Sequence, residues 1–151
     1  MRGREHVEAI IAGLADGTID VIASDHAPHA QEKKMQELDQ APFGVIGLET
    51  SLGLVITKLI QPGHLDWPTA LAKMTVNPAR ILGSDKGTLR LGADADVTII
   101  DPDVRWRVDP ARFRSKSVNT PFAGWELVGR AEVVLVDGCV KYNRQGSDKH
   151  E

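Results

Sequence analysis

Residues 19–29 constrain this chain more than any other segment, because an apolar strand pattern runs there directly into acidic and imidazole side chains. Residues 19–23 have the pattern of a short buried strand. Asp25, His26 and His29 follow at its C-terminal end, where α/β folds gather their ligand-binding side chains. These residue types can supply a metal ligand, a general base or a hydrogen-bond donor to an anion. The alternative is an ordinary polar loop with Asp25 as a helix cap, and the residues alone leave both interpretations open.

Three motifs extend this pattern along the chain: SDHAPH at residues 24–29, PFGVIGLET at residues 42–50 and NPARILG at residues 77–83. Together they resemble the C-terminal third of a dihydroorotase of the amidohydrolase superfamily. The resemblance covers about residues 5–142, which is nearly the whole chain. It implies a zinc-dependent enzyme that reversibly hydrolyses the cyclic amide of dihydroorotate to N-carbamoyl-aspartate in pyrimidine biosynthesis.

The resemblance also implies roles for five residues. Asp25 is implied to be the catalytic residue, which closes the last barrel strand, binds Zn²⁺ and shuttles the proton. His29 is implied to contact the carboxylate of the substrate. Pro42, Phe43 and Gly44 are implied to give backbone contacts to the pyrimidine ring, and Gly44 has no side chain to block that approach.

Two further residues of the SDHAPH motif have supporting roles by the same resemblance. Ser24 and His26 are expected to brace the end of the strand, His26 through hydrogen bonds behind the site. Hydantoinases and allantoinases share the strand-end Asp-His pair but usually lack the second histidine, so His29 favours a dihydroorotase. These related cyclic amidohydrolases stay as an alternative.

The implied fold class is α/β: the C-terminal part of a metal-dependent hydrolase TIM (β/α)8 barrel, followed by strands of a small β-sandwich domain. A complete barrel of this kind needs roughly 200 residues or more, whereas this chain has 151. We expect residues 1–86 to belong to the barrel, with its last strand at residues 19–25. Residues 87–144 are expected to form strands of the composite sandwich, and residues 145–151 a disordered tail.

The other functional residues of the family lie before the segment that this chain resembles. The chain has 5 histidines and no His-x-His pair, and catalytic zinc typically takes about three protein ligands. We therefore expect the chain alone to lack most of its zinc ligands and to be inactive, as a fragment, a split-gene product or a remnant. A second class of function stays open, namely a non-catalytic partner of aspartate transcarbamoylase.

Local patterns predict helices in the first half of the chain. Apolar residues at helical spacing predict one helix at residues 4–16, stopped by Gly17, and another at residues 46–60. Asp66 and Asn77, each closely followed by a proline, predict the N-caps of two more helices.

The second half of the chain has the pattern of short strands. β-branched and apolar runs predict strands at residues 95–101, 132–136 and 140–142. Asp137 and Gly138 predict a tight turn between the last two strands.

Composition limits the possible partners. The formal net charge is -3 and no basic patch stands out, which argues against nucleic acid or an anionic membrane as a partner. The apolar runs are far shorter than the ~20 residues of a transmembrane helix, so we expect a cytoplasmic protein. The single cysteine, Cys139, is expected to be a small core residue. Sheet edges without neighbouring strands are prone to pair with another chain, so we expect a homo-oligomer or an N-terminal complement as partner. The resemblance implies aspartate transcarbamoylase as a further possible partner.

Overall fold

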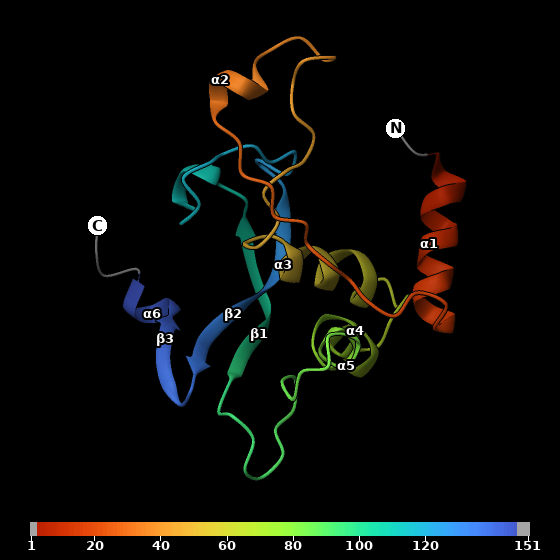
Figure 1. Cartoon of the computed structure of the whole chain (residues 1–151), viewed down its shortest axis with the longest axis vertical. Coiled ribbons are helices and arrows are strands. Elements are labelled where there is room, and N and C mark those ends of the chain that lie inside the picture. The colour runs from red at the N-terminus through yellow and green to blue at the C-terminus, as the bar shows by residue number, and fades with distance from the viewer. Residues whose placement is uncertain (1–2, 148–151) are drawn as a thin grey trace.

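The structure is a computed structural model that describes residues 3–147. Short helices pack beside one antiparallel sheet (Figure 1). The helical elements are α1 (Arg4–Asp16), α2 (Gln31–Lys34), α3 (Ser51–Val55), the π-helical turn η1 (Ile56–Ile60), α4 (Trp67–Met74), α5 (Val76–Ile81), the 3-10 turn η2 (Pro110–Arg112) and α6 (Arg144–Ser147). The strands are β1 (Val97–Arg107), β2 (Glu126–Val136) and β3 (Cys139–Asn143). Within residues 3–147, no helix has the length and apolar character needed to cross a lipid bilayer.

The sheet has the strand order β1-β2-β3, and both pairings are antiparallel. β1 and β2 pair along their length, with shifts of register between Ile99 and Ile100 and between Asp101 and Arg105. The turn from β2 to β3 has Asp137 at φ 50° and Gly138 at φ 73°. Two successive left-handed residues are typical of a tight hairpin turn, so the predicted turn is confirmed. β1 and β2 are longer than the sequence pattern predicts.

Helices α3 and η1 lie against β2, and a glycine permits their close approach. A Cβ atom on Gly129, which has a φ of 81°, would lie 2.2 Å from the Cδ1 atom of Ile56. Ile56 and Leu127 are buried at this contact, and the Val128 N–H donates to Thr57 Oγ1 at 2.9 Å. The helical segment formed by α3 and η1 is therefore anchored to the sheet.

A second apolar cluster joins α1 to the helices that follow it. Its buried members are Leu14, Val55, Leu65 and Ala70. Helix α1 ends, as predicted, at Gly17, which has a φ of 87°. Val7 and Ile10 on the same helix are 50% and 51% exposed, and α1 stands at the side of the molecule (Figure 1). Only the C-terminal end of α1 is packed in the described part of the chain.

The sequence predicts a strand at residues 19–25, but the structure has none there. The Ile22 N–H donates to the Lys73 carbonyl of α4 at 3.0 Å rather than to a strand. A strand forms only beside a partner strand, and this stretch leads into one isolated parallel bridge, between His26 and Val45. The described residues therefore show neither a closed barrel nor the second sheet of a sandwich.

The predicted helix starts are partly correct. Asp66 caps α4 by accepting from the Thr69 N–H at 2.9 Å, as predicted. Helix α3 begins at Ser51, later than predicted. Asn77 is not an N-cap, because it lies inside α5 and its amide donates to the Asp20 carbonyl at 3.0 Å.

The C-terminal end also differs from the sequence-based expectation. The tail predicted to be disordered at residues 145–151 begins inside helix α6, where Arg144 Nε donates to the Glu132 carboxylate. Residues 148–151 lie outside the described residues. Cys139 is exposed at the start of β3, so the prediction of a core cysteine is wrong. The division of the chain at residue 86 stays a prediction.

Candidate active site

The SDHAPH segment, residues 24–29, lies beside the loop formed by residues 42–47. The Ala27 N–H donates to the Val45 carbonyl at 2.9 Å. Gly47 approaches the same segment so closely that a Cβ atom on it would lie 2.5 Å from the Ser24 carbonyl oxygen. Two motifs that the sequence analysis singled out are therefore in direct contact.

His26 fastens the end of this loop. Its Nδ1 accepts hydrogen bonds from the backbone N–H groups of Gly47, at 3.2 Å, and Leu48, at 3.4 Å. An acceptor nitrogen is unprotonated, so the ring carries its proton on Nε2. His26 was expected to brace the end of a strand, whereas in the structure its ring holds the turn that precedes α3.

His29 and Phe43, both predicted to bind substrate, are brought together. The Nε2 atom of His29 lies 2.9 Å from the Phe43 carbonyl oxygen, so Nε2–H is the donor and Nδ1 is left for another partner. The Phe43 side chain is 92% exposed. The two predicted substrate-binding residues are thus joined by a hydrogen bond from the His29 ring to the Phe43 backbone carbonyl.

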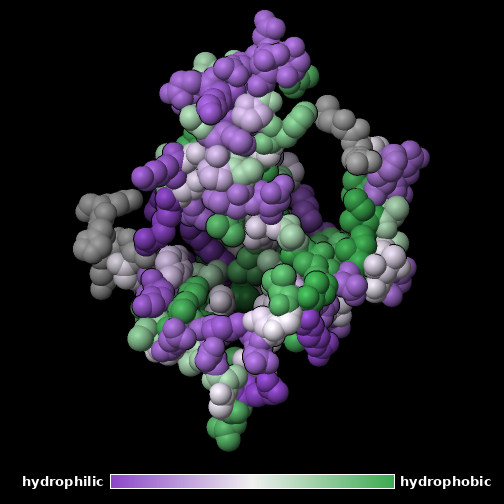
Figure 2. Space-filling view, in the orientation of Figure 1, coloured by the Kyte–Doolittle hydropathy of each residue, from purple (hydrophilic) through white to green (hydrophobic). Residues whose placement is uncertain are grey.

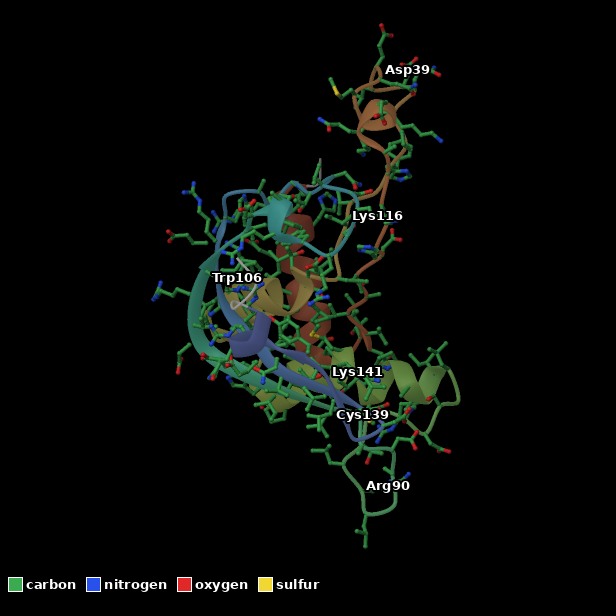
Figure 3. All side chains as sticks on the ribbon, turned by 90° about the vertical axis from the view of Figure 1, so that its left-hand side faces the viewer. Asp39, Arg90, Trp106, Lys116, Cys139 and Lys141 are labelled. Atoms are coloured by element: carbon green, nitrogen blue, oxygen red, sulfur yellow. The ribbon has the colours of Figure 1, made fainter. Side chains whose placement is uncertain are left out.

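Lys34, at the end of α2, contacts the same loop. Its ammonium donates to the carbonyls of Pro42, at 2.9 Å, and Gly44, at 3.2 Å. The residues around Asp39 between these two points project away from the rest of the molecule (Figure 3) and form a hydrophilic surface at the top of Figure 2. Residues 30–40 are mostly exposed and have no regular structure beyond the single turn of α2. The hydrogen bonds from Lys34 to the loop at residues 42–47 were not predicted from the sequence.

Asn119 is a site residue that the sequence analysis missed. Its amide donates to the Ala27 carbonyl at 2.9 Å and to the Gly44 carbonyl at 3.4 Å, and its Oδ1 accepts from the His29 N–H at 3.3 Å. Its backbone carbonyl accepts from the Ile46 N–H at 3.1 Å. Asn119 belongs to the segment between η2 and β2, and no local signal in that segment marks it.

Asp25 has the backbone strain that often accompanies a functional residue. Its φ is 42°, a left-handed conformation that few residues other than glycine adopt, although aspartate tolerates it. Its side chain is exposed. Within residues 3–147 no hydrogen bond or ion pair to the Asp25 carboxylate is found, so the group is open to an external ligand.

The described residues do not by themselves form a metal centre. Within residues 3–147, no group of three or more His, Cys, Asp or Glu side chains is placed to hold a metal ion. The carboxylate of Asp25 is one ligand, which is fewer than the three or so protein ligands typical of catalytic zinc.

A cavity of about 480 Å³ lies on the other side of His26, between α3 and β2. Trp106, labelled in Figure 3, lines it and donates from Nε1 to the Gly129 carbonyl at 3.0 Å. The Arg130 guanidinium stacks 4.7 Å from the centre of the Trp106 ring. Asp25 and His29 do not line this cavity. The candidate site is thus the SDHAPH segment with the loop at residues 42–47, rather than this cavity.

The clearest electrostatic cluster lies away from the site, before β1. Lys86 Nζ lies 2.6 Å from Asp94 Oδ2 and 2.7 Å from Asp96 Oδ2. Hydrogen bonds to Asp94 and Asp96 hold the pKa of Lys86 above its ordinary value. Lys86, followed by the Asp137 N–H, lowers the pKa of Asp96. This cluster ties the entry of β1 to the β2–β3 turn.

Comparison with known proteins identifies the class to which this arrangement belongs. The model of the family described as "Amidohydrolase family" matches residues 1–140. The chain therefore belongs to the amidohydrolase family.

Within that family, the chain resembles proteins named dihydroorotase. It is 58% identical over 140 residues to the dihydroorotase of Pelotomaculum thermopropionicum, covering 93% of this chain and 33% of the relative. It is 51% identical over 142 residues to the dihydroorotase of Geobacter sp. strain M21, covering 94% and 33%. The chain thus spans about a third of the length of these relatives.

Solved structures show the same arrangement of elements. The L-hydantoinase (dihydropyrimidinase) of Arthrobacter aurescens matches with a TM-score of 0.89 and 34% identity, over 95% of this chain and 33% of that one. The D-hydantoinase (dihydropyrimidinase) of Thermus sp. matches with a TM-score of 0.88 and 28% identity, over 95% and 32%. The described helices and sheet therefore have the fold of the matching third of these proteins.

Proposed function

We propose that this chain is the dihydroorotase part that carries the end of the last barrel strand and, with it, the catalytic carboxylate. The complete protein would hydrolyse the cyclic amide of dihydroorotate reversibly to N-carbamoyl-aspartate. The identity of 58% to a protein named dihydroorotase supports this substrate. The observation that carries the proposal is the contact between His29 Nε2 and the Phe43 carbonyl at 2.9 Å, because it joins the two motifs that would bind the substrate.

In this proposal Asp25 is the general base and acid. Its exposed carboxylate, which has no partner in the described part of the chain, would accept a proton from the attacking water. The water oxygen then bonds to the amide carbon, the ring C–N bond breaks, and Asp25 returns the proton to the leaving nitrogen. Asp25 would also be one zinc ligand. Since the described residues hold too few ligands for zinc, we propose that residues outside this chain complete the zinc site.

Substrate binding is proposed for His29 and the neighbouring loop. A protonated His29 ring that donates from Nε2 to Phe43 can also donate from Nδ1 to the carboxylate of dihydroorotate. Within residues 3–147, no hydrogen bond from the backbone N–H groups of Phe43 and Gly44 is found. These two donors would face the carbonyl oxygens of the pyrimidine ring.

A second candidate is a hydantoinase-type activity on a related cyclic amide. The 34% identity to an L-hydantoinase (dihydropyrimidinase) supports it. The two substrates differ in the carboxylate that dihydroorotate carries and that His29 would bind. Activity on hydantoin or dihydrouracil, with none on dihydroorotate, would favour this second candidate.

We further propose that the chain associates with other chains. Leu89 and Leu91, in the loop between α5 and β1, are 80% and 106% exposed, and we propose that they contribute to such an interface. A second copy, an N-terminal complement and aspartate transcarbamoylase are the candidate partners. Co-purification with transcarbamoylase, without turnover of dihydroorotate in any mixture, would support a non-catalytic role.

A chimera tests the proposed function. The matching third of the Pelotomaculum thermopropionicum dihydroorotase is replaced by this chain, and turnover of dihydroorotate, dihydrouracil and hydantoin is measured. We expect turnover of dihydroorotate, and its loss in Asp25→Asn by about a thousandfold or more, as for other groups that transfer protons and bind metal. Asp20→Asn is the matched control, because Asp20 is an exposed aspartate of the same segment. A chimera that folds but does not turn over dihydroorotate contradicts the proposal.

A further inference from the structure

Three consecutive carbonyl groups of the substrate loop are each bound by a donor from a different part of the chain. Lys34 donates to Pro42 at 2.9 Å and to Gly44 at 3.2 Å. His29 donates to Phe43 at 2.9 Å, and Asn119 donates to Gly44 at 3.4 Å. The orientation of each peptide plane in this loop is therefore set from outside the loop.

Asn119 differs from the other two donors because it binds both motifs at once. Its Nδ2 joins the Ala27 carbonyl, at 2.9 Å, to the Gly44 carbonyl. Its Oδ1 accepts from the His29 N–H, and its backbone carbonyl accepts from the Ile46 N–H. One amide side chain thus fixes the SDHAPH segment and the loop to each other.

The Gly44 N–H, which has no hydrogen bond within residues 3–147, shares a peptide plane with the Phe43 carbonyl, which His29 binds. Asn119 acts on this plane through His29, and it acts directly on the next plane of the loop. Peptide groups are planar, so a carbonyl that points toward Asn119 turns the N–H group of the next residue to the opposite side. The bond to the Gly44 carbonyl therefore sets the plane shared by Gly44 and Val45. The bond to the His29 N–H fixes the backbone that carries the imidazole ring.

We propose that Asn119 is a positioning residue, which holds His29 and the Phe43–Gly44 backbone in the geometry that binds substrate. The identity of the substrate in this proposal rests on the proposed function. The hydrogen bonds of Asn119 do not depend on that function. Among the described residues, no hydrogen bond joins Asn119 to Asp25. It should therefore affect the binding of substrate more than the transfer of the proton.

Hydrogen exchange on the 151-residue chain tests the geometry without any assay of activity. Asn119→Asp keeps the acceptor for the His29 N–H and loses the donor to Ala27 and Gly44, whereas Asn119→Ala loses both. We expect exchange at the Ala27 N–H to accelerate about tenfold in both variants, by the loss of two hydrogen bonds. Exchange at the His29 N–H should accelerate only in Asn119→Ala.

Asn77→Asp is the matched control for this experiment. Asn77 also donates to a distant backbone carbonyl, that of Asp20, at 3.0 Å, but it lies outside the site. The Asn77→Asp substitution should leave the exchange rates of the Ala27 and His29 N–H groups unchanged. Unchanged protection at Ala27 in both Asn119 variants would overturn the proposal.

Kinetics of the chimera described above test the consequence for substrate. We expect Asn119→Asp to raise KM for dihydroorotate about tenfold while kcat changes by less than about threefold. A loss confined to kcat, or a KM equal to that of the unsubstituted chimera, would overturn the positioning role. An unsubstituted chimera without turnover would instead contradict the proposed function, and hydrogen exchange would still decide the role of Asn119.

Discussion

Gly44 and Ala27 are so close that a Cβ atom on Gly44 would lie 2.6 Å from the Cβ atom of Ala27. Gly44 also has a φ of 103°, a backbone conformation that residues with a side chain rarely adopt. The contact is therefore possible only with glycine in the loop. It brings a residue predicted to bind substrate against the middle of the SDHAPH segment.

Gly44→Ala is expected to destabilise the chain more than a glycine substitution that suffers backbone strain alone. Gly63→Ala is the control, since Gly63 has a φ of 78° and nothing lies within 4 Å of its added Cβ. We expect Gly63→Ala to lower the free energy of unfolding by about 1 kcal/mol, and Gly44→Ala by roughly 1–3 kcal/mol more through overpacking. Urea unfolding followed by tryptophan fluorescence measures both. Equal losses in the two variants would mean that the two segments do not touch as described.

Lys34→Ala is expected to loosen the projecting loop at residues 35–41. Removal of the ammonium leaves the Pro42 and Gly44 carbonyls without that donor, at a cost of about 1 kcal/mol, which corresponds to roughly fivefold more frequent opening. Chymotrypsin cleavage at Leu38 or Phe43, which are 90% and 92% exposed, should accelerate by a similar factor. Lys33→Ala serves as control, because Lys33 is an exposed residue of the same helix. Similar cleavage rates in both variants would count against the contact.

The stability of α4 is expected to depend on pH through Asp66. Hydrogen bonds from Thr69 hold the pKa of Asp66 below its ordinary value of 3.8. A carboxyl with a lowered pKa in the folded state stabilises the fold above the ordinary value, and this contribution is lost as the pH falls through the lowered pKa. The pKa values of Asp16 and Asp96 are also lowered, so their contributions to stability are likewise lost as the pH falls.

Asp66→Asn isolates that contribution, since asparagine also caps helices but does not titrate. The free energy of unfolding of the variant should fall less steeply than that of the unsubstituted chain as the pH drops from about 5 to 2. Parallel curves for the two proteins would show that the Asp66 carboxylate adds nothing to the pH dependence.

The structural features that were predicted correctly are determined by residues adjacent in the sequence. The stop of α1 at Gly17, the Asp66 cap and the turn at Asp137 and Gly138 each need only a few adjacent residues, so local chemistry determines them. The strand at residues 19–25 needs a partner strand, and the described part of the chain has none beside it. Its apolar pattern was therefore not enough to make it a strand.

The candidate site shows the same division between local and distant information. The resemblance indicated Asp25, His29, Phe43 and Gly44, and the structure brings the last three together. Asn119 and Lys34 were missed because they act through backbone carbonyls of distant residues, and a hydrogen bond of this kind leaves no pattern in the sequence. The roles of Asp25, His29 and the loop residues all came from the resemblance, and they stay proposals.

The most direct test of the central claim is the zinc content per molecule, measured together with dihydroorotase turnover, for this chain alone and for the chimera. We predict that the chain alone holds no stoichiometric zinc and has no turnover. The chimera should hold zinc and turn over dihydroorotate, and Asp25→Asn should lower both. Turnover by the purified 151-residue chain, or a chimera whose zinc and turnover are unaffected by Asp25→Asn, would contradict the claim that Asp25 is a ligand and catalytic residue of a shared site.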